Sequence, residues 1–497
     1  MRVEARPRSL CWGAVMAIET RLQNQNFKRK KLAKTGWRRD RFVEQTAVAA
    51  AAGNGYGRND LAPPLSIEYR RTDALRPAKH RPRKLDAAHV KRLIQSIRRF
   101  GFRGAILVKG DHIVDGHVRH AAAAKLGLPT IPCIDAADLS DDEIRLLAIT
   151  LNRLGELGDW DIDTLKIELE HAIELNFDIE ITGFTPAEQD IILLDHAAEE
   201  AAEEVIPEPP REPVSRPGDL FRLGEHQIVC GSALDPAVYM ALLQERPISV
   251  VVADFPYNCT ITNNVSGLGK KKHGEFVMAS GEMSREEFSR FLRDAIRCSS
   301  TNLIDGGVFF GFMDWRQIDV LIGTGREAGL SLINMCVWNK GSGGMGSLYR
   351  SAYELLPVFC KGDTPAINNV QLGKHGRDRS NVHSYPGANQ RGSSASRALA
   401  DHPTPKNVEH IVDLLLDVSH RGDAVLDPFL GSGTTIIAAE QTGRIGFGIE
   451  LDPKYVDVAV RRWEQLTGRD AVHGASGLTL DELAAHRRNE AIASHSR

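Results

Sequence analysis

Two acidic side chains that follow apolar, strand-like stretches indicate where this chain does its chemistry. The stretch VVVAD at 250–254 has the small and β-branched residues typical of a strand buried on both faces of a parallel sheet. It ends in Asp254 and continues with Pro256 and Tyr257. Open α/β sheets bind their ligands at the carboxyl ends of strands. Taken alone, these residues are equally compatible with a turn, because Asp and Pro are common turn residues.

A second string, AVLDPFLGSGTTIIAAEQTGRIGFGIELDPKY at 424–455, is more specific. Its first strand ends in Asp427, a tight loop with Gly431 and Gly433 follows, and a helix is predicted to begin at Thr434. Such a loop presents backbone N–H groups and a helix N-terminus to a ligand. The next strand ends in Glu450, where an acid can accept hydrogen bonds from two ribose hydroxyls.

Two better-known glycine loops do not fit this string. A dinucleotide fingerprint needs a third glycine where Ile436 stands, and a phosphate-binding P-loop needs a Gly-Lys-Ser/Thr sequence that is absent. The pattern therefore predicts a nucleoside site without phosphate-binding machinery. S-adenosylmethionine is the cofactor that suits such a site.

Strands and helices are predicted to alternate around both strings. The strands are expected at 250–254, 306–312, 334–338, 355–360, 424–427 and 445–450, with helices at 285–298 and 316–328 among them. Alternation over this length predicts a Rossmann-like, doubly wound, mostly parallel α/β sheet. An α+β region precedes it, with helices predicted within 85–102, at 141–154 and from a capping box at Thr185 and Glu188.

Composition changes along the 497-residue chain predict five parts: a basic tail at 1–65, an α+β domain at 66–202, a linker at 203–217, an α/β domain at 218–470 and a tail at 471–497. Residues 1–60 hold thirteen Lys or Arg against five acids, a net charge of +8. The linker carries five prolines and is predicted to be stiff and extended. We therefore expect the domains to fold independently, and a fragment starting near Arg216 to be soluble.

The remaining composition is that of an ordinary globular protein, with 42% hydrophobic and 26% charged residues and a net charge of -3. Seven cysteines without paired spacing favour a reducing compartment. No apolar run is long enough to cross a membrane. The expected location is the cytoplasm, in association with the nucleoid.

Residues 219–465 resemble the amino-methyltransferases of DNA. The resemblance rests on Asp254-Phe255-Pro256-Tyr257, similar to the family's Asp-Pro-Pro-Tyr, and on DPFLGSGTT at 427–435; their order is that of the beta class. It implies catalytic roles for Asp254, Pro256 and Tyr257. It implies that S-adenosylmethionine is bound by Asp427, Phe429, Gly431, Gly433, Thr434, Glu450, Thr404, Lys406 and Ser232. Phe255 and Ser232 depart from the family pattern, which more often has Pro and Asp there.

The resemblance also implies the reaction. The lone pair of an exocyclic amine is conjugated with its base, so the amine is a poor nucleophile. Asp254 and a neighbouring backbone carbonyl can each accept one of its N–H groups, which directs the lone pair at the sulfonium methyl. Tyr257 would stack on a base extruded from the duplex. Asp rather than Ser at position 254 favours adenine N6; cytosine N4, or a DNA- or nucleotide-binding protein with an inactive methyltransferase domain, stays open.

Double-stranded DNA is the expected partner. The polar segment 361–403 lies where this family keeps its target-recognition residues, and 267–276 forms a second basic loop. The side chains expected to bind DNA are Lys270, Lys271, Lys272, Lys374, Arg377, Arg379 and Arg391.

Residues 66–175 resemble the ParB/sulfiredoxin superfamily, through HIVDGHVRHAAAAKLGLPTIPCI at 112–134 among other strings. The resemblance implies binding of DNA, CTP or another nucleotide through Gly116 and Arg119, and a homodimer is possible. The turn has His117 where sulfiredoxins have Cys, so peroxiredoxin repair is not expected. The nearby histidines are interpreted as plain surface, and no metal is predicted.

Overall fold

The computed structural model describes residues 65–78, 85–154, 157–158, 160–175, 177, 179–194, 206–258, 281–341, 349–370, 377, 379–386 and 406–495. The chain divides into two compact units, Met1–Leu157 and Gly158–Arg497. The boundaries predicted from composition differ from this division, and they stay predictions. Along the described part, no helix is both long and apolar enough to cross a membrane.

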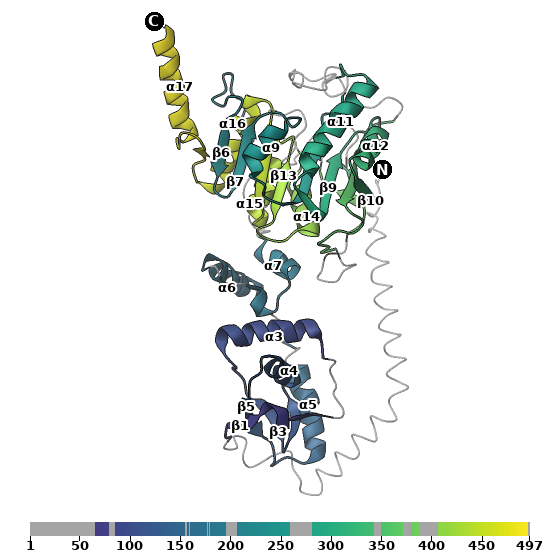
Figure 1. The fold of residues 1–497 in the computed structure, drawn as a ribbon, viewed down its shortest axis with the longest axis vertical. Helices are drawn as coiled ribbons and strands as arrows, with labels where there is room; N and C mark the ends of the chain where they lie inside the picture. The colour runs from purple at the N-terminus through teal and green to yellow at the C-terminus, as the bar shows by residue number, and fades with distance from the viewer. Residues whose placement is uncertain are drawn as a thin grey trace, which may run out of the picture. The chain divides into compact units, whose positions relative to one another are not determined.

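Unit 1 is a small mixed sheet covered by helices (Figure 1). Its strands, in the order β1-β5-β3-β4-β2, are β1 (Glu68–Arg71), β2 (Arg76–Pro77), β3 (Ile106–Lys109), β4 (His112–Asp115) and β5 (Thr130–Asp135). Its helices are α3 (Ala87–Phe100), α4 (His117–Lys125) and α5 (Asp141–Leu154), with a 3-10 turn at Thr72–Ala74. Alternate apolar residues of the strands form the core, including Ile106, Val108, Ile131 and Cys133. The predicted α+β character is confirmed.

Unit 2 is built on a ten-stranded sheet in the order β12-β10-β11-β9-β8-β13-β14-β7-β6-β15. The strands are β6 (Leu220–Leu223), β7 (His226–Cys230), β8 (Ile248–Asp254), β9 (Leu303–Phe312), β10 (Leu330–Asn339), β11 (Tyr353–Lys361), β12 (Val382–Ser384), β13 (Ala424–Asp427), β14 (Ile445–Glu450) and β15 (Val472–His473). The five central strands β9-β8-β13-β14-β7 are parallel. β11 and β6 join the sheet in antiparallel pairing at its two sides, so the predicted mostly parallel sheet is confirmed at the centre.

Helices cover both faces of this sheet. They are α9 (Pro236–Leu243), α11 (Arg285–Ser300), α12 (Ile318–Glu327), α14 (Val408–Val418), α15 (Thr434–Thr442) and α16 (Pro453–Thr467); α6 (Ile162–Glu174), η2 (Ile179–Thr182) and α7 (Pro186–Leu193) precede the sheet and α17 (Leu480–His495) follows it. The VVVAD stretch shows how the two faces are filled. Val251 packs in the core that includes α11, whereas Val250 and Val252 pack in the core that includes α14. This strand is therefore buried on both faces, as its composition predicts.

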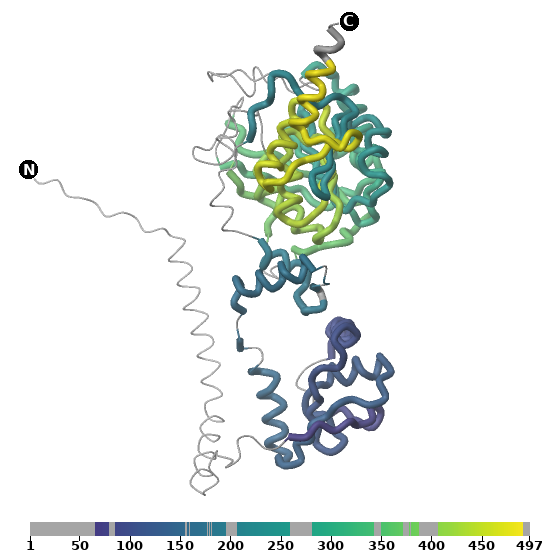
Figure 2. The backbone as a smooth tube through the Cα atoms, turned by 90° about the vertical axis from the view of Figure 1, so that its left-hand side faces the viewer, coloured from purple at the N-terminus to yellow at the C-terminus, as the bar shows by residue number. Residues whose placement is uncertain are grey.

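β6 and β15, the first and the last strand of the ten-stranded sheet along the chain, pair with each other. The yellow helix α17 follows β15 and projects beyond the sheet (Figure 1, Figure 2). The described part of the predicted linker also packs on this unit. Ile206 is buried against Val458, and the backbone N–H groups of Val214 and Ser215 donate to the Asp457 carboxylate at 2.6 and 3.0 Å. This part of the linker is therefore held by α16, which a proline-rich composition does not indicate.

Candidate active site

The sheet brings the two acidic strand ends together at its carboxyl edge. β8 and β13 are adjacent parallel strands, with Val250 beside Val425 and Val251 beside Leu426. β8 pairs with β9 on its other side and β13 pairs with β14, so the order of strands reverses between them. Such a reversal opens a crevice at the carboxyl ends of the strands, where α/β sheets bind ligands.

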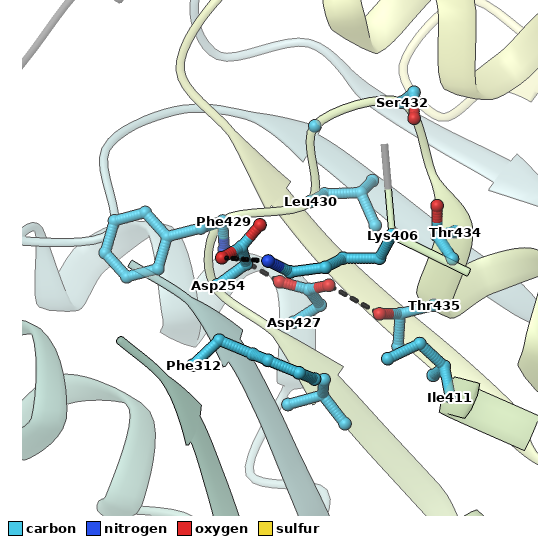
Figure 3. A pocket seen from close by; sticks show the side chains of 12 residues that line it. Asp254, Phe312, Lys406, Ile411, Asp427, Phe429, Leu430, Ser432, Thr434 and Thr435 are labelled. Atoms are coloured by element: carbon cyan, nitrogen blue, oxygen red, sulfur yellow. Dashed lines mark hydrogen bonds and ion pairs between the residues drawn. The ribbon is translucent and has the colours of Figure 1, made fainter. Parts of the chain in front are cut away.

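A pocket of about 390 Å³, including space open to solvent, lies at this point (Figure 3). The lining residues come from β8, β9, β13, the loop after β13, α15, α14 and the segment before α14. They include Asp254, Phe312, Lys406, Ile411, Asp427, Phe429, Gly431, Thr434 and Thr435. Asp254 and Asp427 thus face one cavity, although they lie far apart in the chain.

The glycine loop after β13 has the conformation that the sequence predicts. Gly431 and Gly433 have φ of 55° and 88°, in the region that favours glycine, and α15 begins at Thr434. A Cβ on Gly433 would lie 2.9 Å from the Ala459 side chain, so glycine also permits α16 to approach the loop. Arg462 of α16, which the sequence analysis missed, donates to the Ser432 carbonyl at 3.1 Å and the Thr434 hydroxyl at 3.0 Å.

The acids of this loop hold its backbone. Asp427 accepts from the Phe429 N–H at 2.9 Å and from the Thr435 hydroxyl at 2.5 Å. Glu450, at the end of β14, accepts from the Gly431 N–H at 2.7 Å. Burial raises the pKa of Asp427 to about 7, and burial likewise raises the pKa of Glu450 to about 7. Both carboxyls therefore titrate near neutral pH, which is common among groups that bind ligands.

Ser232 lies close to this site through strand pairing. Glu450 pairs with Cys230 at the end of β7, and the Gly231 N–H donates to the Glu450 carbonyl at 2.9 Å. The Ser232 hydroxyl accepts from the Leu234 N–H at 3.2 Å. Ser232 therefore follows the strand next to Glu450, in a turn that its own side chain stabilises.

The tetrapeptide 254–257 follows β8 and approaches the glycine loop. Phe255 is buried, with its ring centroid 5.2 Å from that of Phe429 and 6.3 Å from that of Phe309. The departure from the family's proline thus puts an aromatic side chain into the core below the loop. The Tyr257 hydroxyl donates to Asp254 Oδ1 at 3.2 Å.

Asn258, which the sequence analysis did not single out, fixes the chain just after the tetrapeptide. It has φ of 52°, its Oδ1 accepts from the Gly281 and Met283 N–H groups, and its Nδ2 donates to the Met283 carbonyl at 2.8 Å. Asn tolerates this left-handed conformation better than most residues, which is the signal that the sequence offered.

Lys406 lies beside Asp254. Its Nζ is 2.9 Å from Asp254 Oδ1, 2.7 Å from Glu354 Oε2 and 3.2 Å from the Tyr257 hydroxyl. Burial raises the pKa of Asp254, and Lys406 opposes that rise. The described hydrogen bonds and ion pairs of Lys406 are with the tetrapeptide and β11, and its expected role in cofactor binding stays a prediction.

Two of the arginines expected to bind DNA have internal partners. Arg377 Nη2 is 2.5 Å from Asp417 Oδ1, and Arg379 Nε is 3.0 Å from Asp417 Oδ2. Both also pair with Asp413 on α14, and their side chains are largely buried. These ion pairs hold both side chains against α14, and the expected DNA contacts of Arg377 and Arg379 stay predictions. The predictions for Thr404, Lys270, Lys271, Lys272, Lys374 and Arg391 fall outside the described residues.

In unit 1, Gly116 and Arg119 lie together at the start of α4. Gly116 is the N-cap residue with φ of 95°, and Arg119 Nη2 pairs with Asp115 Oδ2 at 2.9 Å. The histidines nearby bond to separate backbone groups: His117 Nε2 accepts from the Ala78 N–H at 3.3 Å, and His120 Nε2 lies 2.9 Å from the Thr72 carbonyl. The nucleotide role of Gly116 and Arg119 stays a prediction.

Comparison with known families matches three segments of the chain. Residues 248–461 match the DNA methylase model of the N6/N4 type, residues 65–152 match the ParB N-terminal domain, and residues 163–217 match the ParB-methyltransferase HTH domain. The chain therefore carries a DNA methylase domain. It joins this domain to a ParB N-terminal domain and a helix-turn-helix domain, the last of which the sequence analysis did not separate from its neighbours.

Individual relatives are distant. The chain is 21% identical over 267 residues to the type II methyltransferase M.HpaI of Haemophilus parainfluenzae, covering 50% of this chain and 77% of the relative. It is 30% identical over 144 residues to the putative methylase YubD of Escherichia coli, covering 29% and 56%. Among solved structures, PvuII DNA methyltransferase (cytosine-N4-specific) has 17% identity and a TM-score of 0.38, covering 55% of this chain and 93% of that one.

Proposed function

We propose that this protein transfers a methyl group from S-adenosylmethionine to the exocyclic N6 of adenine in double-stranded DNA. The observation that carries the proposal is the meeting of Asp254 and the glycine loop at one pocket of the methylase domain. Asp at position 254, where the family's cytosine-N4 enzymes more often have Ser, favours adenine over cytosine.

The residues around the pocket fit the cofactor. The loop is glycine-rich where a ligand must approach the backbone, and Glu450 places a carboxylate beside it to accept from ribose hydroxyls. S-adenosylmethionine supplies, when bound, a methyl group activated by the positive sulfonium. Asp427, Phe429, Gly431, Gly433, Thr434, Glu450 and Ser232 are the described residues that we assign to holding it.

Asp254 and Tyr257 are assigned to the target base. Asp254 Oδ1 accepts from Tyr257 and Lys406, and across the part of the chain that is described no group donates to Oδ2. Oδ2 can therefore accept an N–H of the target amine, while the carbonyl of Phe255 or Pro256 accepts the other. This arrangement holds the lone pair toward the methyl group, a contribution of positioning and electrostatics that needs no covalent intermediate. Tyr257 offers its ring to the extruded base.

The other parts of the chain are assigned to binding. We propose that the ParB-like domain contacts DNA or a nucleotide such as CTP near Gly116 and Arg119, that the protein acts in the cytoplasm at the nucleoid, and that it forms a homodimer. We also propose that the chain is divided into the five parts that its composition predicts.

The test is the modification pattern of host DNA. Single-molecule sequencing after expression of the full chain should report N6-methyladenine in one short sequence motif. Asp254→Ala should lower the methylation rate by about 10²–10³-fold, because the acceptor of the amine N–H is lost. Calorimetry should show S-adenosylmethionine binding unchanged in this variant. Methylated cytosine would favour the N4 alternative, and an unmethylated genome with no cofactor binding would favour the inactive-domain alternative.

A further inference from the structure

Four charged side chains form a cluster behind the tetrapeptide. Lys406 bridges Asp254 and Glu354 at 2.9 and 2.7 Å, and Lys340 forms an ion pair with the other oxygen of Glu354. The side chains of Lys406 and Glu354 are 10% and 9% exposed. Buried charges are costly unless they are paired, so each member of this cluster depends on its neighbours.

Aromatic rings fix the position of the Lys406 ammonium. Its Nζ lies 4.7 Å from the ring centroid of Phe312, 5.4 Å from that of Trp338 and 5.6 Å from that of Tyr257. Cations favour such positions over aromatic faces. The ammonium is thus held in contact with both the Glu354 and the Asp254 carboxylate.

We propose that Lys406 and Glu354 are positioning residues for methyl transfer, an inference that rests on the proposed function. Glu354 holds the Lys406 ammonium, and the ammonium keeps Asp254 ionised. By binding Oδ1, the ammonium also orients the Asp254 carboxylate so that Oδ2 faces the pocket for the target amine. The sequence alone assigns no role to Glu354. In this proposal Lys406 acts on the Asp254 carboxylate, which binds the target base.

The charges around Asp254 determine the expected pH dependence. The groups that face it are Lys406 before α14, Glu354 on β11, Tyr257 after β8 and Asp427 on β13; His410 of α14 and Lys340 face the same cluster. Burial raises the pKa of Asp254, Lys406 lowers it and Glu354 raises it. Removing Lys406 should therefore raise the pKa of Asp254 further, whereas removing the charge of Glu354 should lower it.

The experiment measures the turnover of radiolabelled S-adenosylmethionine on methylation-free phage DNA at saturating substrate, from pH 5.5 to 9.5. For Lys406→Met we expect at least about a tenfold fall in kcat at pH 7. The acid limb of the pH profile of kcat should shift upward by about one pH unit or more, so that alkaline pH restores part of the rate. For Glu354→Gln we expect a several-fold fall in kcat, because the Lys406 ammonium is no longer held in place by Glu354, and we expect the acid limb of the pH profile to shift to lower pH.

Lys361→Met is the matched control. Lys361 is a half-buried lysine at the other end of β11, where its Nζ donates to the Leu303 carbonyl at 2.6 Å. This variant should keep the kcat and the pH profile of the unaltered protein. Calorimetry with S-adenosylmethionine should give the same dissociation constant for all three variants.

Three outcomes would overturn the inference. One is an unchanged kcat and acid limb in Lys406→Met; another is a weakened cofactor affinity with an unchanged acid limb, which would make Lys406 a cofactor ligand. If Lys406→Met does not fold, the isosteric Glu354→Gln decides, and an unaltered rate and profile would overturn the proposal. An unaltered protein that binds the cofactor but methylates no DNA would instead refute the proposed function, together with this inference.

Discussion

The two edges of the central sheet each carry a buried cluster of charges, and the clusters differ in how completely they are satisfied. At the amino edge, Arg444 before β14 binds Asp190 of α7 through two hydrogen bonds, at 2.9 and 2.8 Å. It also donates to the Thr442 carbonyl and to the carbonyl and hydroxyl of Ser419. All five N–H groups of this guanidinium have partners.

The carboxyl edge is different. Lys406 and Glu354 are paired, but Asp254 lines a pocket. The comparison separates two uses of buried charge. A cluster whose charges are all paired holds the fold together, whereas a cluster with a carboxylate that lines a cavity is ready to bind a ligand.

The largest expected effect combines the loss of the amino-edge cluster with the loss of the linker contacts on α16. A fragment starting near Arg216, which the sequence predicts to fold by itself, lacks Asp190 and the N–H groups of Val214 and Ser215 that bind Asp457. We expect its free energy of unfolding to fall by at least about 3–5 kcal/mol relative to a fragment starting at Gly158. Urea denaturation of both fragments measures the difference. Equal midpoints and slopes would show that these two sets of contacts contribute nothing.

Arg444→Met isolates one contact of that edge. Asp190 would be left buried and unpaired, apart from Arg421 at 3.9 Å, and the full chain should lose about 3–5 kcal/mol of unfolding free energy. The double variant Arg444→Met/Asp190→Leu should regain much of this loss, because apolar residues can replace a buried pair. A double variant no more stable than Arg444→Met would contradict the assignment.

Glu450→Ala tests the carboxyl edge. It should remove a charge-assisted bond to the cofactor ribose worth about 1.5–3 kcal/mol, so affinity for S-adenosylmethionine should fall about ten- to a hundredfold. Isothermal calorimetry measures this change. An unaltered dissociation constant would reject the role of Glu450.

The smallest expected effect is a pH dependence of cofactor affinity. The pKa of Glu450 and that of Asp427 are raised to about 7 by burial, and the ionised form of Glu450 is the better acceptor for ribose hydroxyls. Affinity should therefore be full above pH 7 and fall below it, by about tenfold between pH 8 and pH 6. Glu450→Gln should flatten this dependence. A dissociation constant that is constant over this range in the unaltered protein would rule out the ionised carboxylate as the ligand.

Local sequence was sufficient for the elements and for much of the pocket. The capping box at Thr185 and Glu188, the strand ending in Asp254 and the glycine loop that opens α15 all lie where the sequence predicts them. Helix caps, alternating burial and left-handed glycines depend on residues a few positions apart. They can therefore be read from the order of side chains alone.

Contacts between distant segments were decided only by the tertiary structure. Arg377 and Arg379 are polar residues of a basic segment, yet they pair with Asp413 and Asp417 of α14. Phe255 stands where the family's Asp-Pro-Pro-Tyr motif has its first proline, and the packing of its ring in the core explains this departure.

The charged groups around Asp254 were also decided only by the tertiary structure. Nothing in the local sequence of Glu354 indicates that it approaches Lys406, because these two residues belong to different elements of unit 2. The sequence by itself determined which chemistry the pocket can hold, since strand ends and loop conformation are local properties. Only packing decided which charges lie beside Asp254, because the partner of a buried charge is selected by the three-dimensional arrangement of the strands and helices around it.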